Sequence, residues 1–120
     1  MSRDLYQVIG IGNAIVDVVI EISLEDLEKE NFEKGKMILV DESVAKSLFS
    51  KYQPKIQCSG GSAANTIAGI AALGGNVSFI GKVRNDDLGS GFESDIRSLG
   101  VKFNTEMATA GPATATCIVF

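Results

Sequence analysis

A chain of 120 residues is long enough for one domain or part of one. Its composition, with 45% apolar and 22% charged residues, is too hydrophobic for a disordered segment. The net charge of −4, without a lysine or arginine cluster, argues against nucleic acid as a partner. Histidine is absent and Cys58 and Cys117 stand far apart, so we expect free thiols and no structural zinc. With neither a signal peptide nor an apolar run of membrane-spanning length, we expect a cytoplasmic protein without a membrane partner.

The first part of the chain predicts mainly strands. Valine and isoleucine predominate at residues 7–12 and 15–22, which predicts two strands with a tight turn between them. Ser23 begins a capping box, and this favours a short helix over residues 24–31. A third strand is predicted over residues 36–40.

From residue 45 onward, helices and strands alternate. The predicted elements are a helix at 45–52, a strand at 55–58, a helix at 62–73, a strand at 77–83 and a helix that Ser90 caps and Gly100 closes. The inward face of the last helix is predicted at Phe92, Ile96 and Leu99. This alternation predicts βαβ units with a parallel sheet, and the fold class is therefore α/β.

The C-terminal segment at residues 114–120 is an apolar strand. Its edge would be unpaired if nothing else covered it, so either another chain lies beside it or the sequence continues. Because no linker or shift in composition divides the chain, we expect a single domain or a portion of one.

The glycines near the N-terminus do not complete a common nucleotide-binding motif. After Gly10 and Gly12, Ile15 stands where a dinucleotide motif has its third glycine, and strand residues follow instead of a helix. A Walker phosphate loop is also missing, because neither Gly-Lys pair has the other residues that this motif needs. A nicotinamide-binding domain stays a minor alternative, which NAD binding would test.

Asp17 interrupts a strand of valine and isoleucine, and its carboxylate has two interpretations. Turned inward, an ionised carboxylate needs hydrogen-bond donors, which substrate hydroxyls could supply. Alternatively, Asp17 alternates outward on an edge strand with its carboxylate in water. The residues alone do not decide between these.

Gly60 and Gly61 stand directly before a predicted helix. Because neither carries a Cβ, the backbone can approach a ligand closely, and the free N–H groups of the helix start would point toward it. Asn65, in the first turn, offers both a donor and an acceptor to a diol. The alternative is a plain glycine loop, with Ser62 as the cap and Asn65 in solvent.

Several motifs follow one another along the chain: Gly10-Ile11-Gly12-Asn13-Ala14-Ile15-Val16-Asp17, Gly60-Gly61-Ser62-Ala63-Ala64-Asn65-Thr66, Leu73-Gly74-Gly75, Phe79-Ile80-Gly81-Lys82-Val83 and Asp86-Asp87-Leu88-Gly89. Together they resemble the N-terminal signature of the ribokinase-like (PfkB) carbohydrate and nucleoside kinases, with the bacterial adenosine kinase branch as the most similar. The resemblance runs the whole length of the chain. It implies a Rossmann-like three-layer sandwich with a small β-sheet lid, of which this chain is the N-terminal part.

The resemblance also implies a substrate-binding set of Asn13, Asp17, Gly60, Gly61 and Asn65. In this family the carboxylate that matches Asp17 accepts hydrogen bonds from sugar hydroxyls. The lid strands would lie near residues 14–22, 36–40 and 103–120, around a βαβ core at residues 55–102. Candidate apolar contacts from the lid are Met37 and Cys117.

The family phosphorylates a hydroxyl of its substrate with ATP and Mg²⁺, but its Gly-Ala-Gly-Asp motif is absent between residues 101 and 120. The catalytic base is therefore expected C-terminal to Phe120, and no catalytic residue or metal ligand is assigned in this chain. Asp86 and Asp87 are interpreted as an acidic helix start rather than a magnesium site. We expect no activity and no tight binding of ATP or Mg²⁺ by these residues alone.

The implied partner is a small-molecule nucleoside or sugar, with adenosine favoured over ribose, fructose and others. A monomer and a lid-mediated homodimer both stay open. The alternative function is a binding module that keeps ligand recognition without catalysis.

Overall fold

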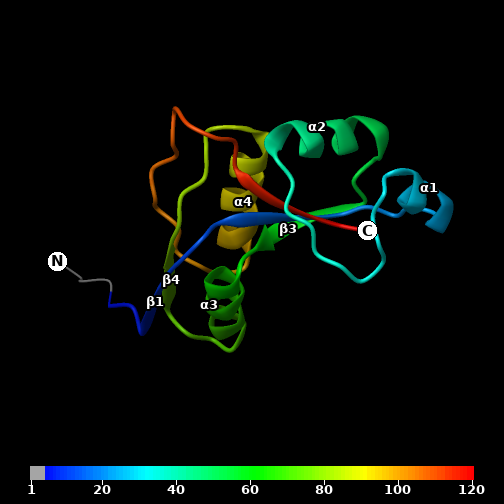
Figure 1. Ribbon diagram of the computed structural model, residues 1–120. Coiled ribbons are helices and arrows are strands. Elements are labelled where there is room, and N and C mark those ends of the chain that lie inside the picture. The colour runs from blue at the N-terminus through cyan, green and yellow to red at the C-terminus, as the bar shows by residue number, and fades with distance from the viewer. Residues whose placement is uncertain (1–4) are drawn as a thin grey trace.

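The computed structural model describes residues 5–120 and shows two small sheets with helices packed against them (Figure 1). In chain order the elements are β1 (Val8–Ile11), β2 (Ile15–Val19), α1 (Leu24–Lys29), α2 (Glu42–Lys51), β3 (Ile56–Gly60), α3 (Ser62–Ala72), β4 (Val77–Ile80), α4 (Asp87–Ser98) and β5 (Ala115–Val119). Within this part of the chain, no helix is both long enough and apolar enough to cross a membrane.

The strands form a parallel pair, β1 with β4, and a three-stranded sheet in the order β3-β2-β5. In the second sheet, β2 runs antiparallel to β3 and parallel to β5. The two predicted N-terminal strands are confirmed, but they belong to different sheets. The N–H of Gly12 still donates to the carbonyl of Ile80, at 3.1 Å, so the chain leaves β4 only after this residue.

One predicted strand does not form, and another forms with a different pairing. Residues 36–40 form no strand and instead lie in the connection between α1 and α2, where Met37 and Leu39 are 87% and 90% exposed. Their apolar sequence favours a strand, but no neighbouring strand supplies hydrogen bonds. The strand predicted at 55–58 forms as β3, yet it pairs antiparallel with β2 in the three-stranded sheet rather than within a parallel βαβ core.

The N-terminus of α4 also differs from the prediction. Asp86, rather than Ser90, is the N-cap, and its Oδ1 accepts the N–H of Gly89 at 2.7 Å. The helix therefore begins earlier and ends at Ser98, which leaves Leu99 47% exposed beyond the buried stripe. The predicted inward positions at Phe92 and Ile96 are confirmed as fully buried.

The core lies where α3 and α4 meet the strands. The rings of Phe79, Phe92 and Phe103 pack together, with centroids 5.3 to 6.1 Å apart. On β1, a Cβ added at Gly10 would stand 2.5 Å from Cγ1 of Ile67, so the glycine lets α3 approach the strand closely. The helix α4 packs on β3 and β2, whereas α3 packs mainly on β1 and β4.

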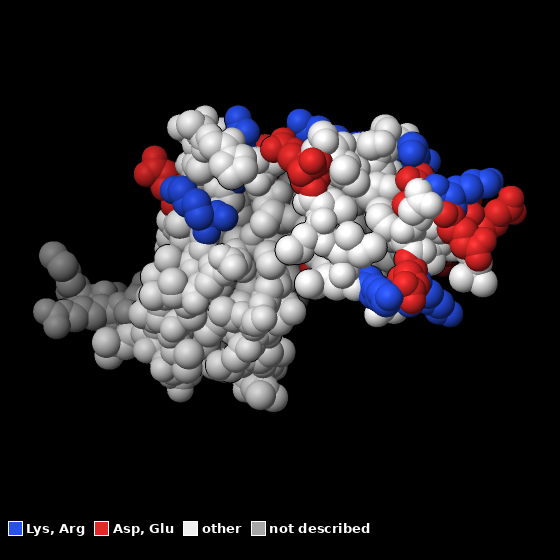
Figure 2. Space-filling model, in the orientation of Figure 1, with Lys and Arg blue, Asp and Glu red and all other residues white. Residues whose placement is uncertain are grey.

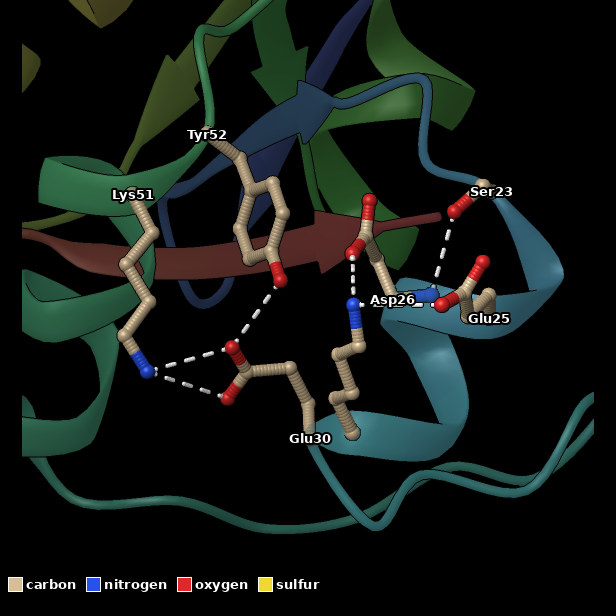
Figure 3. A network of polar contacts seen from close by, with 7 residues as sticks. Ser23, Glu25, Asp26, Glu30, Lys51 and Tyr52 are labelled. Atoms are coloured by element: carbon tan, nitrogen blue, oxygen red, sulfur yellow. Dashed lines mark hydrogen bonds and ion pairs between the residues drawn. The ribbon is translucent and has the colours of Figure 1, made fainter.

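At the far end of the molecule, α1 and α2 are joined by polar contacts (Figure 3). Glu30 accepts hydrogen bonds from Lys51, at 3.1 Å, and from the Tyr52 hydroxyl, at 3.0 Å. Both acidic and basic side chains cluster over this end, where Figure 2 shows them interspersed. Beside this network, the Phe120 ring stacks on Phe32, which fixes the chain just after β5.

Candidate functional site

The three-stranded sheet has one covered face and one open face. Along β2, Val16 and Val18 are buried in the core, whereas Asp17 points to the other face and is half-buried. Because paired residues share a face, the strand register places the following residues on the open side: Ile15, Asp17, Val19, Ile56, Cys58, Gly60, Ala115, Cys117 and Val119. Asp17 is the one charged residue in this set, at its centre.

The two sequence interpretations of Asp17 are both modified by this arrangement. Its strand is central in the sheet rather than at an edge, but its side chain lies opposite the core. Directly across from it stand Cys58 on β3 and Cys117 on β5. Asp17 is therefore flanked by two thiols on an otherwise apolar surface.

The sequence did not indicate Cys58 as a candidate site residue, although it is Asp17's neighbour in the sheet. Its thiol is half-buried and Cys117 is exposed. Burial raises the pKa of the Cys58 thiol, and the negative charges of Asp17 and Asp95 raise it further. The signal that could have found it is the two-residue spacing to Gly60, which places both residues on one face of a strand.

Gly61 joins the open face to α3. It has a φ of +105° and is the N-cap of the helix, in place of Ser62, without a capping side chain. A Cβ at this position would stand 2.5 Å from the backbone oxygen of Asn13, so the chain segment before β2 approaches closely here. The fold thus brings Asn13 and Gly61 together at the end of the sheet that holds Gly60.

Asn65 and Met37 differ in how the structure places them. Asn65 lies in the first turn of α3, where its N–H donates to the carbonyl of Gly61 at 2.8 Å, and its side chain is exposed. Met37 lies in the loop between α1 and α2, outside the strands whose register defines the open face. Of the two candidate lid contacts, Cys117 is on the face with Asp17 and Met37 is not part of it.

A buried polar network holds β5 in place. Thr114, 5% exposed, directly precedes this strand; its N–H and hydroxyl both donate to the Asp86 carboxylate, at 3.0 and 2.7 Å. Burial alone would raise the pKa of Asp86, but the hydrogen bonds from Thr114 and Gly89 outweigh it and lower the pKa. Asp86 and Asp87 thus form the acidic helix start that the sequence predicted.

Neither of two surface hollows coincides with the open face. One, of about 330 Å³, is lined by Arg97, Gly100, Val101, Lys102, Phe103 and Asn104. The other, of about 300 Å³, lies along α1. Asp17 lines neither of these hollows, and residues 5–120 contain no group of three or more Cys, Asp and Glu side chains that could hold a metal ion.

The comparison with known families decides what kind of chain carries this face. The family model described as pfkB family carbohydrate kinase matches residues 37–120. The chain belongs to the pfkB family. Within that match lie Gly60, Gly61, Asn65 and β5, whereas Asn13 and Asp17 precede it.

Solved structures and a curated sequence agree with this pfkB assignment. An adenosine kinase from Sinorhizobium meliloti is 43% identical, with a TM-score of 0.79 over 94% of this chain and 35% of that one. A probable sugar kinase from Rhizobium etli is 40% identical, with a TM-score of 0.79 over 94% and 34%. A fructokinase from Klebsiella pneumoniae is 32% identical over 85 residues, which is 71% of this chain and 28% of the fructokinase.

The pfkB chain thus spans about a third of the length of these relatives. Mixed parallel and antiparallel sheets with helices, matched at these TM-scores, confirm the predicted ribokinase-like α/β fold. The pfkB kinases are phosphotransferases, so the chain is part of a transferase family.

Proposed function

We propose that the complete protein transfers the γ-phosphoryl group of ATP to the primary hydroxyl of a nucleoside or sugar, and that adenosine is its substrate. This chain supplies the sugar-recognition part of a single kinase domain. The observation that carries the proposal is the Asp17 carboxylate, alone on an apolar open face beside Gly60 and Gly61. Support for adenosine comes from the 43% identity with the Sinorhizobium meliloti enzyme.

In this proposal the side chains and backbone around Asp17 recognise adjacent hydroxyls. Asp17 accepts hydrogen bonds from these hydroxyls, Asn65 offers a donor and an acceptor, and Asn13 lies beside Gly61. Gly61 lets the backbone come close to the ligand because it has no Cβ. An analogue without the hydroxyls would leave the carboxylate and amide unpaired, and this loss sets the substrate class.

The apolar residues around Asp17 give the three-stranded sheet a second role. When the sheet closes over a bound ligand as a lid, these side chains exclude water that would compete as phosphoryl acceptor. Cys58 and Cys117 would then contact the base or sugar ring.

Since relatives extend about three times the length of this chain, the proposal assigns ATP, Mg²⁺ and the catalytic base to polypeptide outside residues 1–120. The expected location is the cytoplasm, with a monomer and a lid-mediated homodimer as the two assemblies to test.

The test is to titrate the chain with adenosine, ribose and fructose by NMR. We expect adenosine to shift the amide signals of β2 and of the first turn of α3. Asp17→Asn should weaken this binding roughly 10- to 100-fold, because a hydrogen bond to a charged acceptor contributes about 1.5–3 kcal/mol. Asp87→Asn, an acidic residue in the first turn of α4, is the matched control and should bind as the unchanged chain does. Equal affinity in both variants contradicts the role of Asp17.

A kinase for another sugar is the second candidate. The fructokinase from Klebsiella pneumoniae and the probable sugar kinase from Rhizobium etli favour it. Tighter binding of fructose or ribose than of adenosine in the same titration would select this candidate. If the complete protein binds one of these ligands but shows no ATP-dependent phosphorylation, the alternative of a non-catalytic binding module replaces both.

A further inference from the structure

The carboxylate of Asp17 occupies the space directly above Gly60. A Cβ built on Gly60 would stand 2.5 Å from Cγ of Asp17 and 2.7 Å from its Oδ1, far inside van der Waals contact. The two residues come from different strands, because Gly60 pairs with Ile15 in the antiparallel register. The Asp17 side chain therefore leans along the sheet, diagonally toward the residue pair at Ile15.

The missing side chain is needed for space and not for backbone conformation. Gly60 is outside the set of glycines with positive φ, whereas its neighbour Gly61 belongs to it. An alanine could adopt the Gly60 backbone without strain. Backbone conformation therefore does not explain the glycine at position 60. The space that the Asp17 carboxylate occupies does explain it.

The neighbouring positions show why the carboxylate takes this direction. Directly across from Asp17, Cys58 and Cys117 each carry a side chain on the same face. Of the two residues paired with Ile15, Ala115 has a Cβ and Gly60 has none. Gly60 is thus the one position among these four neighbours that leaves the face open.

We propose that Gly60 is a positioning residue: the space above it seats the Asp17 carboxylate and fixes the direction from which that carboxylate meets the substrate. This inference rests on the proposed function and gives Gly60 a role distinct from ligand contact. The seated carboxylate lies above the residue that directly precedes Gly61, the N-cap of α3. A ligand with adjacent hydroxyls would meet an acceptor held at a defined place relative to this helix start.

The test compares Gly60→Ala with two matched glycine-to-alanine controls. A Cβ at Gly69 or Gly91 would meet nothing within 4 Å, and both glycines lie inside helices. Gly60→Ala should lose little stability, because the group that must move is the end of a flexible side chain. Its affinity for adenosine should fall roughly 10-fold or more, as for a lost charged hydrogen bond. Gly69→Ala and Gly91→Ala should keep the original affinity.

A second readout needs no ligand. The charge of Asp17 contributes to the raised pKa of Cys58, so the pH dependence of Cys58 alkylation, measured in a Cys117→Ser background, reports where the carboxylate lies. Asp17→Ala should lower the Cys58 pKa, Gly60→Ala should shift it, and the two control variants should leave it unchanged. In the Asp17→Ala background, adding Gly60→Ala should produce no further shift, because the displaced group is gone.

The outcomes separate the two proposals. A Cys58 pKa in Gly60→Ala equal to that of the controls overturns the seating of Asp17, whatever the affinity. A shifted Cys58 pKa with reduced adenosine affinity supports the inference. If the pKa shifts but affinity for every ligand that binds is unchanged, Gly60 is no positioning residue for substrate, although the proposed function stands. If the unchanged chain and the complete protein bind neither adenosine, ribose nor fructose, the proposed function fails and with it the substrate role of Gly60.

Discussion

The glycines of β1 and of β3 leave space for different kinds of group. Above Gly10, the space is filled by the side chain of Ile67, which is only 2% exposed. Above Gly60, it is filled by the carboxylate of Asp17, which is half-buried on an open face. The same missing methyl group therefore allows close apolar packing in one sheet and holds a charge in the other. Substitutions around Gly10 should therefore change mainly the stability of the fold, whereas substitutions around Gly60 should change mainly ligand recognition.

The largest expected effect on the free energy of unfolding is in the apolar core. Phe92→Ala removes a ring that is fully buried between Phe79 and Phe103. We expect the free energy of unfolding to fall by about 3–5 kcal/mol, from lost burial and the cavity left behind. On the open face, Val119→Ala should change it by only about 0.5 kcal/mol. Urea unfolding followed by circular dichroism checks both, and similar losses would contradict the division into a closed core and an open face.

Adding a methyl group to each strand gives the sharpest version of the comparison. Gly10→Ala forces the buried Ile67 side chain to move, and overpacking of this kind lowers the free energy of unfolding by about 1–3 kcal/mol. Gly60→Ala should lower it much less, because the Asp17 carboxylate can swing into solvent. Thermal unfolding of the two variants side by side is the measurement. An equal loss would show that the space above Gly60 is part of the core.

The network that anchors β5 should show a smaller effect that depends on pH. Asp86→Ala removes the N-cap of α4 and the acceptor of Thr114, which should lower the free energy of unfolding by about 1–2 kcal/mol at pH 7. The pKa of Asp86 is lowered on folding, so its contribution is complete above the ordinary value of 3.8 and is lost as the pH falls through the lowered pKa.

The unfolding free energies of the unchanged chain and of Asp86→Ala should therefore converge in acid. Asp87→Ala, at an exposed position in the same helix turn, serves as the control and should keep a nearly constant difference. A gap between the unchanged chain and Asp86→Ala that widens as the pH drops below 3.8 would contradict a lowered pKa of Asp86.

The smallest effect is expected at the exposed network between α1 and α2. Hydrogen bonding to Lys51 and then to Tyr52 lowers the pKa of Glu30. Lys51→Met should raise that pKa toward its ordinary value, and more than Tyr52→Phe does, with little change in stability because surface ion pairs contribute little. Carboxyl NMR titration measures it. If the pKa of Glu30 is the same in Lys51→Met as in the unchanged chain, this ion pair is absent in solution.

Elements defined by local signals could be predicted from the sequence. The short helix predicted after Ser23 is confirmed. It could be predicted because Ser23 accepts its capping hydrogen bond from the N–H of Asp26, only three residues further along the chain. The helix after Gly60-Gly61 is confirmed for a similar reason, since its small and apolar residues repeat at helical spacing. The α/β class follows from the alternation of helix and strand patterns along the chain, and the family resemblance follows from short motifs.

Strand partners and the site geometry needed the tertiary structure. A strand forms only where a second strand supplies hydrogen bonds, and for this reason β3 joined β2 while residues 36–40 stayed without a partner. Asp17 and Gly60 were both named from the sequence, but nothing near either residue in the chain specifies that one lies above the other. That contact depends on the antiparallel register of two distant segments, which only the packed sheet determines.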